Sequence, residues 1–408
     1  MMRRRDLLKS LPVLAASGLR MPSLFAQAKP RMKITDVRLA KVKLVQDLGT
    51  YTNAFHTPAR PVPVRTGGFS ITEIYTDQNV VGIGPSIPAE MVATAKAILV
   101  GQDPFDIENH ARWLYIQGRW GAQVEIALWD LVGKATNQPL YKLWGGGKDK
   151  VMPYGATMGL GDGPAERARV AAQVKADGFR AVKMRSSYPT MKEDIQLMEQ
   201  SRKAVGDDFL LLVDANKAGP YGNSQLVTVW DYRRALETAL EFQKLNVYWL
   251  EEPLGRFDYE GLAELNRSLD MKLAGGEANT RLDEYRTYLE KGCYDILNCD
   301  VGVLGPTLYR QSVDLAFAMD RRVVPHAGTT VLAEFCAIHL AASHPQLPYG
   351  NLDTAPHFEL EHNPPLQDFR KMWSVFQNPP DLDGNGFIPL PNEPGLGVTI
   401  KPELIDRS

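Results

Sequence analysis

A TIM-like (β/α)7–8 barrel preceded by an α+β N-terminal domain is the fold class that this sequence of 408 residues predicts. From Val151 onward, short apolar runs alternate with amphipathic helical patterns, as strands and helices alternate in a βα barrel. Eight such runs follow one another within roughly 200 residues, which favours a barrel over an open doubly wound sheet. No glycine-rich phosphate-binding fingerprint follows any of these runs.

Residues 1–28 are predicted to be a twin-arginine signal peptide. Arg4-Arg5 opens the segment RRDLLK, a modest apolar stretch follows, and Ala26-Gln27-Ala28 has the small-x-small pattern of a cleavage site. The mature chain would begin near Lys29 and would be exported, already folded, to the periplasm. The alternative interpretation is a disordered basic tail.

Composition excludes two classes of partner. Without residues 1–28 the chain is more acidic than its formal charge of −2 and has no basic stripe, which argues against nucleic-acid binding. No apolar run reaches the eighteen or so residues of a membrane span. The three cysteines lie in apolar runs without metal-ligand spacing, so we expect buried free thiols.

Residues 29–150 are expected to form the α+β domain. Segments 33–45 and 69–84 are rich in β-formers, and the second contains a hairpin signal at Asp77-Gln78-Asn79. Segment 47–68 between them has no period, which predicts a long structureless loop with a functional role, such as a lid. His56 on this loop is a candidate substrate-binding residue. A helix starting at Glu125 is apolar on nearly every face and should therefore be buried.

Residues 151–375 are expected to form the barrel. Its predicted strands are 151–159, 178–185, 209–216, 247–253, 272–277, 294–300, 321–326 and 349–353. Polar side chains close six of them in order: Lys183 and Arg185, then Asp214, Glu251, Glu277, Asp300 and His326. Because parallel strands converge at their C-terminal ends, these side chains should meet at one face of the barrel.

Asp214, Glu251 and Glu277 are the predicted metal ligands. An all-carboxylate set suits a hard divalent cation, Mg²⁺ in particular, and disfavours zinc. Neighbouring strand residues point to opposite faces, so Glu251 is assigned as the ligand and Glu252 as its support. The alternative is that each acid caps the following helix or pairs with a lysine at the mouth of the barrel.

The remaining polar residues predict acid–base and binding roles. Asp300 would hold one ring nitrogen of His326 and leave the other free as a general base. Lys183 and Arg185 share one face of their strand, but only the lysine has a pKa that can fall far enough to act as a base. They could instead form ion pairs with the acids. Two further candidates contact the substrate, Asn216 by hydrogen bonds and Asp353 by accepting or donating a proton.

At these residues the chain resembles the mandelate racemase and muconate lactonizing enzyme branch of the enolase superfamily. The motifs that carry the resemblance are ALWDLVGKATNQPLYKLWGG, KMR, DAN, WLEEP, GGE, the Asp300…His326 pair and PGLGV. The resemblance implies that the N-terminal domain caps the barrel and that segment 376–408 returns to complete it. It also implies an even-numbered homo-oligomer, a small carboxylate substrate chelated by Mg²⁺, and a base that removes the α-proton.

One departure from the family pattern narrows the reaction. Members with bases on both faces of the site carry Lys-x-Lys on the second strand, whereas this chain has Arg185 in place of the second lysine. Arginine does not accept a proton, so two-base racemisation is disfavoured and His326 is the remaining base. The resemblance then implies a dehydratase of sugar acids or similar α-hydroxy acids. The alternatives are an epimerase, racemase or cycloisomerase on the same scaffold, and an exported sugar-acid binding protein without catalytic activity.

Overall fold

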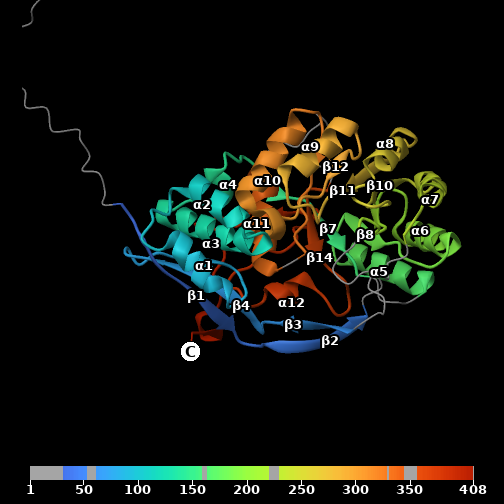
Figure 1. Ribbon diagram of the computed structural model, residues 1–408. Helices are drawn as coiled ribbons and strands as arrows, with labels where there is room; N and C mark the ends of the chain where they lie inside the picture. Colours follow the sequence, from blue (N-terminus) through green and yellow to red (C-terminus); the bar gives the residue numbers. More distant parts are fainter. Residues whose placement is uncertain are drawn as a thin grey trace, which may run out of the picture.

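An antiparallel sheet and a curled parallel sheet organise the chain in the computed structural model (Figure 1). The structure describes residues 31–52, 61–158, 163–219, 229–328, 330–343 and 356–407. The predicted signal segment, His56 and Asp353 lie outside these ranges.

The antiparallel sheet has the strand order β16-β1-β4-β5. Its strands are β1 (Ile34–Val42), β4 (Phe69–Thr76), β5 (Val81–Pro85) and β16 (Ile405–Asp406). The hairpin predicted at Asp77–Asn79 joins β4 to β5 and is confirmed. Helices α1 (Met91–Leu99), α2 (Ile107–Tyr115), α3 (Arg119–Thr136) and α4 (Leu140–Leu143) follow. Helix α3 is buried from Gly121 to Gly133, as its apolar pattern predicts.

Segment 47–68 is not structureless, so that prediction was wrong. Strands β2 (Gln46–Thr52) and β3 (Pro61–Thr66) form an antiparallel two-stranded sheet. Prolines lower the strand signal of a sequence because they cannot donate to a β-ladder. Each strand of a two-stranded sheet has an unpaired edge, however, so Pro61 and Pro63 are tolerated in β3.

The predicted barrel is confirmed as a curled sheet of eight parallel strands in the order β13-β12-β11-β10-β9-β8-β7-β14. Its strands are β7 (Pro153–Ala156), β8 (Ala181–Arg185), β9 (Leu210–Asp214), β10 (Val247–Glu251), β11 (Lys272–Gly275), β12 (Ile296–Leu297), β13 (Arg322–Val323) and β14 (Phe358–Glu361). The backbone N–H of Glu359 donates to the carbonyl of Pro325 at 3.1 Å, so the two ends of the sheet meet.

The eighth strand lies further along the chain than predicted. Strand β14 (Phe358–Glu361) takes this place next to β7, whereas the expected segment 349–353 is outside the described residues. Its sequence FELE alternates apolar and acidic side chains, which is typical of a strand with one solvated face. Here both faces are buried, because Phe358 and Leu360 face the surrounding helices and Glu359 is enclosed by the barrel.

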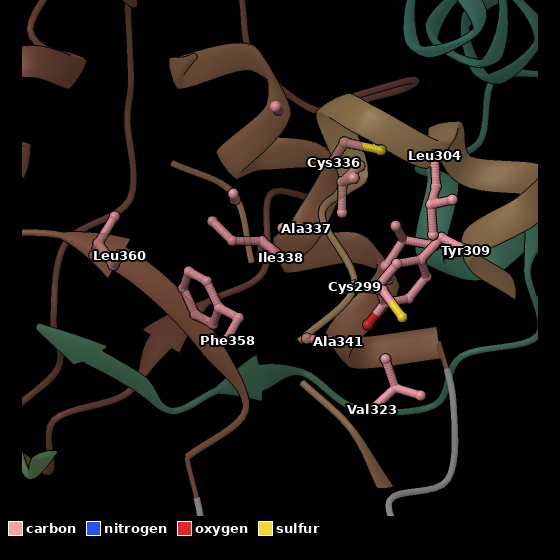
Figure 2. Close-up of a cluster of buried hydrophobic side chains, with 14 of the residues drawn as sticks. Cys299, Leu304, Tyr309, Val323, Cys336, Ala337, Ile338, Ala341, Phe358 and Leu360 are labelled. Atoms are coloured by element: carbon pink, nitrogen blue, oxygen red, sulfur yellow. The ribbon is translucent and has the colours of Figure 1, made fainter. Parts of the chain in front are cut away.

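Helices cover the outside of the barrel (Figure 1). They are α5 (Pro164–Ala176), α6 (Met191–Val205), α7 (Tyr232–Lys244), α8 (Tyr259–Arg267), α9 (Leu282–Lys291), α10 (Val301–Phe317) and α11 (Val331–Ser343). Figure 2 shows Cys299, Tyr309 and Cys336 packed between this layer and the sheet. All three cysteines are buried and free, as predicted.

The barrel interior is closed by side chains rather than open as a channel. Its buried apolar residues are Tyr154, Ala156, Ala181, Leu212, Trp249, Ala274, Ile296 and Val324. The rings of Tyr154 and Trp249 meet edge to face with centroids 5.3 Å apart. This plug forms the floor on which the polar strand ends stand.

The C-terminal segment returns to both earlier parts of the chain. After α12 (Phe369–Trp373), strand β15 (Ile388–Pro389) pairs with β6 (Lys150–Val151), and β16 pairs with β1 beyond the 3-10 helix η2 (Pro402–Leu404). None of the helices in the described ranges combines the length and apolar character that crossing a lipid bilayer requires.

The carboxylate of Asp130 joins three parts of the chain. It lies on α3 with no exposed surface and accepts hydrogen bonds from the backbone N–H groups of Ile83 at 2.7 Å and Leu396 at 2.8 Å. Lys134, one turn along the helix, pairs with it at 2.6 Å. The antiparallel sheet, its helix and the returning C-terminal segment therefore share one buried acceptor.

We predict that Asp130→Ala lowers the free energy of unfolding by on the order of 3 kcal/mol, because two buried N–H groups lose their acceptor. Denaturant titration followed by circular dichroism measures this. Glu290→Gln, which changes an exposed acid on α9, is the control and should unfold like the wild type. Equal stability of Asp130→Ala and the wild type would contradict the role given to Asp130.

Candidate active site

Strand register brings the predicted polar residues into one row. Arg185 of β8 is opposite Asp214 of β9, and Asp214 is opposite Glu251 of β10. Glu277 lies two residues beyond the end of β11, and Asp300 and His326 pair by an isolated parallel bridge beyond β12 and β13. The row follows the C-terminal ends of the strands, where βα barrels carry their active sites.

Asp214, Glu251 and Glu277 form a candidate metal site. Each offers an oxygen atom, and the three atoms lie within 4.8 Å of one another. Burial raises the pKa of Glu251 to about 8, and Asp214 adds to this shift. One oxygen of Glu277, Oε2, is buried and lies 3.1 Å from His326 Nε2. Three carboxylates this close together fit a hard divalent cation, which would offset their mutual repulsion.

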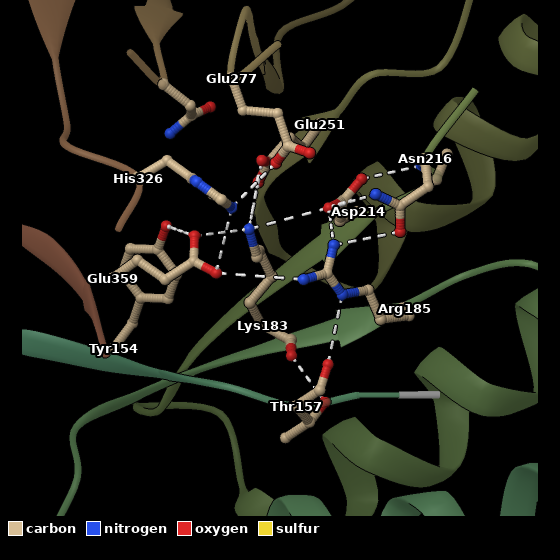
Figure 3. Close-up of polar contacts among 12 residues, drawn as sticks. Tyr154, Thr157, Lys183, Arg185, Asp214, Asn216, Glu251, Glu277, His326 and Glu359 are labelled. Atoms are coloured by element: carbon tan, nitrogen blue, oxygen red, sulfur yellow. Dashed lines mark hydrogen bonds and ion pairs between the residues drawn. The ribbon is translucent and has the colours of Figure 1, made fainter. Parts of the chain in front are cut away.

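Asn216 and Arg185 hold Asp214 in place (Figure 3). Asn216 donates to both carboxylate oxygens, from its backbone N–H at 2.8 Å and from Nδ2 at 2.9 Å. Arg185 Nη1 donates to Asp214 and also to Asn216 Oδ1 at 3.1 Å. Burial lowers the pKa of Arg185, but Asp214 and Glu359 raise it by more, so the guanidinium stays charged.

Lys183 lies at the centre of the acidic groups (Figure 3). Its ammonium donates to Glu251 Oε1 at 3.1 Å, to Glu251 Oε2 at 3.0 Å and to Glu359 Oε2 at 2.9 Å. Asp214 Oδ2 is 3.7 Å away, and Lys183 has no exposed surface. Burial lowers its pKa, but the charges of Glu251 and Glu359 raise it by more and keep it above the ordinary value.

His326 and Asp300 form the predicted dyad. His326 Nδ1 is 2.6 Å from Asp300 Oδ2, while Asp300 Oδ1 accepts from the N–H of Val303 at 3.1 Å as the N-cap of α10. The carboxylate is thus fixed by the helix and orients the ring. Nε2 of His326 faces the acids, 3.1 Å from Glu277 Oε2 and 3.7 Å from Glu359 Oε1. Burial lowers the pKa of His326, but Glu359, Glu277 and Asp300 together raise it well above its ordinary value.

Sequence reasoning missed Glu359 and Glu361, the two acids of β14. The alternating sequence FELE is a strand signal that could have placed both acids, but the eighth strand was expected at 349–353. Glu359 is buried and binds Lys183 and the Tyr154 hydroxyl. Glu361 accepts from the side-chain nitrogen of Gln367, and burial, then the charge of Glu359, raises its pKa.

A cavity of about 390 Å³ opens between the β2–β3 sheet and the barrel. Tyr51 and Arg65 line it from the β2–β3 sheet, and Glu361 and Gly328 from the barrel. A Cβ atom on Gly328 would lie 3.0 Å from His326 Cε1 and 3.1 Å from Glu361 Oε1. Gly328 therefore lines the cavity and lies directly beside the ring of His326, where a larger side chain would crowd it. The segment predicted as a lid contributes a wall of this cavity.

Comparison with known proteins places this arrangement among related chains. The family model for the mandelate racemase / muconate lactonizing enzyme N-terminal domain matches residues 50–145, and the enolase C-terminal domain-like model matches residues 165–404.

Proteins named for different activities are similar to this chain in sequence or in fold. L-talarate/galactarate dehydratase from Salmonella typhimurium is 30% identical over 312 residues, which cover 71% of this chain and 74% of that protein. D-galactarolactone cycloisomerase from Agrobacterium fabrum is 29% identical over 358 residues, 82% of this chain and 89% of that protein. The crystal structure of a racemase from Streptomyces coelicolor with bound magnesium has a TM-score of 0.71 and 25% identity, covering 91% of this chain and 99% of that one.

We predict that Mg²⁺ raises the thermal unfolding midpoint of the wild-type protein after treatment with a chelator. An ion that binds only the folded state stabilises it by about 2.7 kcal/mol at a concentration 100 times its Kd. Glu277→Gln should lose most of this shift, whereas Glu264→Gln on the exposed surface of α8 should keep it. An undiminished shift in Glu277→Gln would show that the ion binds elsewhere.

Proposed function

Because the chain belongs to the mandelate racemase / muconate lactonizing enzyme family of the enolase superfamily, we propose that it is a Mg²⁺-dependent dehydratase of a sugar acid or similar α-hydroxy acid. The reaction removes the proton α to the carboxylate and then eliminates water from the β-carbon. The observation that carries this proposal is that the two faces of the site differ. One face has the His326–Asp300 dyad, and the other has Lys183 and Arg185, which buried acids hold in their charged forms.

Asp214, Glu251 and Glu277 would hold the magnesium ion. When bound, the ion supplies positive charge that offsets the acids around His326 and stabilises the dianion formed as the α-proton leaves. Magnesium in a relative of the same fold agrees with this choice of ion. The cationic groups of Lys183 and Arg185 add fixed positive charge at the same end of the barrel, where they would orient the substrate carboxylate.

His326 would carry both proton transfers. With Nδ1 held by Asp300, its neutral ring presents Nε2 as the base that takes the α-proton. The imidazolium would then give this proton to the β-hydroxyl group, which leaves as water while the Cα–Cβ double bond forms. The resulting enol tautomerises to a keto acid. One residue can serve both steps where the α-proton and the β-hydroxyl group depart on the same face of the substrate.

The opposite face lacks an equivalent base among the described residues. Arg185 does not release its proton at ordinary pH, and Lys183 is held by Glu251 and Glu359 with its pKa above the ordinary value. Two-base racemisation needs a neutral acceptor there, so the arrangement favours elimination. A cycloisomerase is the second candidate, because a relative of that name is 29% identical to this chain and the dehydratase 30%.

We predict that a screen of acid sugars with Mg²⁺ detects keto-acid formation by the wild type. His326→Asn should lower kcat by about 10²-fold or more, since it removes the only proposed proton carrier. The variant should keep its Mg²⁺-dependent thermal shift, which shows that the metal site is intact. Turnover unchanged in His326→Asn would rule out this mechanism, and binding of an acid sugar without turnover by the wild type would favour a binding protein.

We also predict the fate of the α-proton in deuterium oxide. Dehydration by one base yields keto acid, and substrate recovered before completion should contain no epimer at Cα. Nuclear magnetic resonance of the reaction mixture measures the keto acid formed and the configuration at Cα of the remaining substrate. Deuterium at Cα with an inverted epimer and no loss of water would instead identify an epimerase and would assign Lys183 as its second base.

A further inference from the structure

Glu359 is a buried acid at the strand ends that belongs neither to the proposed metal ligands nor to the dyad, and its carboxylate contacts Lys183 directly. We propose that it is a positioning residue that shares the ammonium group of Lys183 with Glu251, and that this sharing sets how freely Glu251 can bind a divalent cation. The inference deepens the proposed function and rests on its metal site.

The contacts of Lys183 show the competition. An ammonium group has three N–H donors, and here they are directed to Glu251 and Glu359. Glu251 accepts with both of its oxygens, at 3.1 and 3.0 Å, so the lysine contacts whichever oxygen a cation at the candidate metal site would use. Glu359, at 2.9 Å, is the partner of Lys183 that lies outside that ligand set.

Glu359 is built to hold the ammonium without moving. The Tyr154 hydroxyl donates to its Oε2 at 2.8 Å, and the backbone N–H of Glu359 binds the carbonyl of Pro325. Tyr154 is itself fully buried against Trp249. Such support gives a fixed anion behind Lys183, which retains the lysine when Glu251 turns to a metal ion.

The second carboxylate oxygen of Glu359, Oε1, faces His326 and Arg185. Oε1 is buried without a hydrogen bond among the described residues and lies 3.7 Å from His326 Nε2 and 3.9 Å from Arg185 Nη2. One carboxylate therefore stands between the cationic pair and the dyad (Figure 3). Its neutral form would leave Lys183 with Glu251 and Asp214 as its only charged partners within 4 Å in the described structure, and both are proposed metal ligands.

The test is the Mg²⁺ affinity of Glu359→Gln measured by isothermal titration calorimetry. This substitution keeps the size of the side chain and removes its charge. We expect the Kd to rise roughly tenfold or more, the effect typical of residues that support metal ligands. Glu361→Gln, two residues along β14, is the matched control: it removes one acid from the same strand but not a partner of Lys183, so the Kd should rise by less than about threefold.

A double-mutant cycle with Lys183→Met separates competition from a general loss of negative charge. If Glu359 acts through the lysine, Glu359→Gln should change the Kd by less than about threefold in the Lys183→Met background. An equal rise in both backgrounds would overturn the proposal. Tyr154→Phe retains every charge and serves where a charge variant fails to fold. It should raise the Kd in the same direction by a smaller factor, and a Kd unchanged in both Tyr154→Phe and Glu359→Gln would also overturn the proposal.

Failure of this inference can be told apart from failure of the proposed function. The calorimetric readout needs no substrate, so the role of Glu359 is decided even if no acid sugar is turned over. Conversely, keto-acid formation by the wild type together with an unaltered Kd in Glu359→Gln would support the dehydratase and reject the positioning role.

Discussion

The candidate site depends on ion pairs that offset the repulsion between carboxylates buried at one end of the barrel. Asp214, Glu251 and Glu359 are all buried at the same end of the barrel, and a buried carboxylate is costly unless it is paired. Lys183 forms ion pairs with all three acids, and Arg185 forms a further ion pair with Asp214. Removing either cation alone would leave uncompensated charge. This balance explains why an all-acid ligand set can exist before a metal ion is considered.

The barrel can hold this concentration of charge because its apolar side chains and its polar strand ends form separate layers. Tyr154 and Trp249 close the interior beneath the strand ends, so Lys183, Asp214 and Glu251 are held in a buried layer with fixed neighbours. The β2–β3 sheet forms a wall of the cavity, and Gly328, beside His326, lines the same cavity. The apolar plug thus supports the strand ends, and the strand ends carry the candidate reactive groups. Chains similar to this one are named as a dehydratase, a cycloisomerase and a racemase.

Much of the fold and site could be predicted from local patterns. Each of Asp214, Glu251 and Glu277 follows an apolar run, and parallel strands have only one common end at which such residues can meet. The buried helix α3 and the dyad followed from similar signals. The errors arose where the local signal was weak or misleading. Prolines weakened the signal of strand β3, and the eighth strand was expected at 349–353, so the acids of β14 were not considered.

The sequence by itself determined which residues stand at the strand ends and in which order, because a strand's length and alternation are local properties. It also determined the asymmetry between the two faces, since an arginine cannot replace a lysine as a base. Only the tertiary structure decided that Glu359 meets Lys183, 176 residues earlier in the chain, and lies between it and His326. That contact arises from closure of the barrel, which brings β14 beside β7, and no local pattern encodes the distance between two such strands.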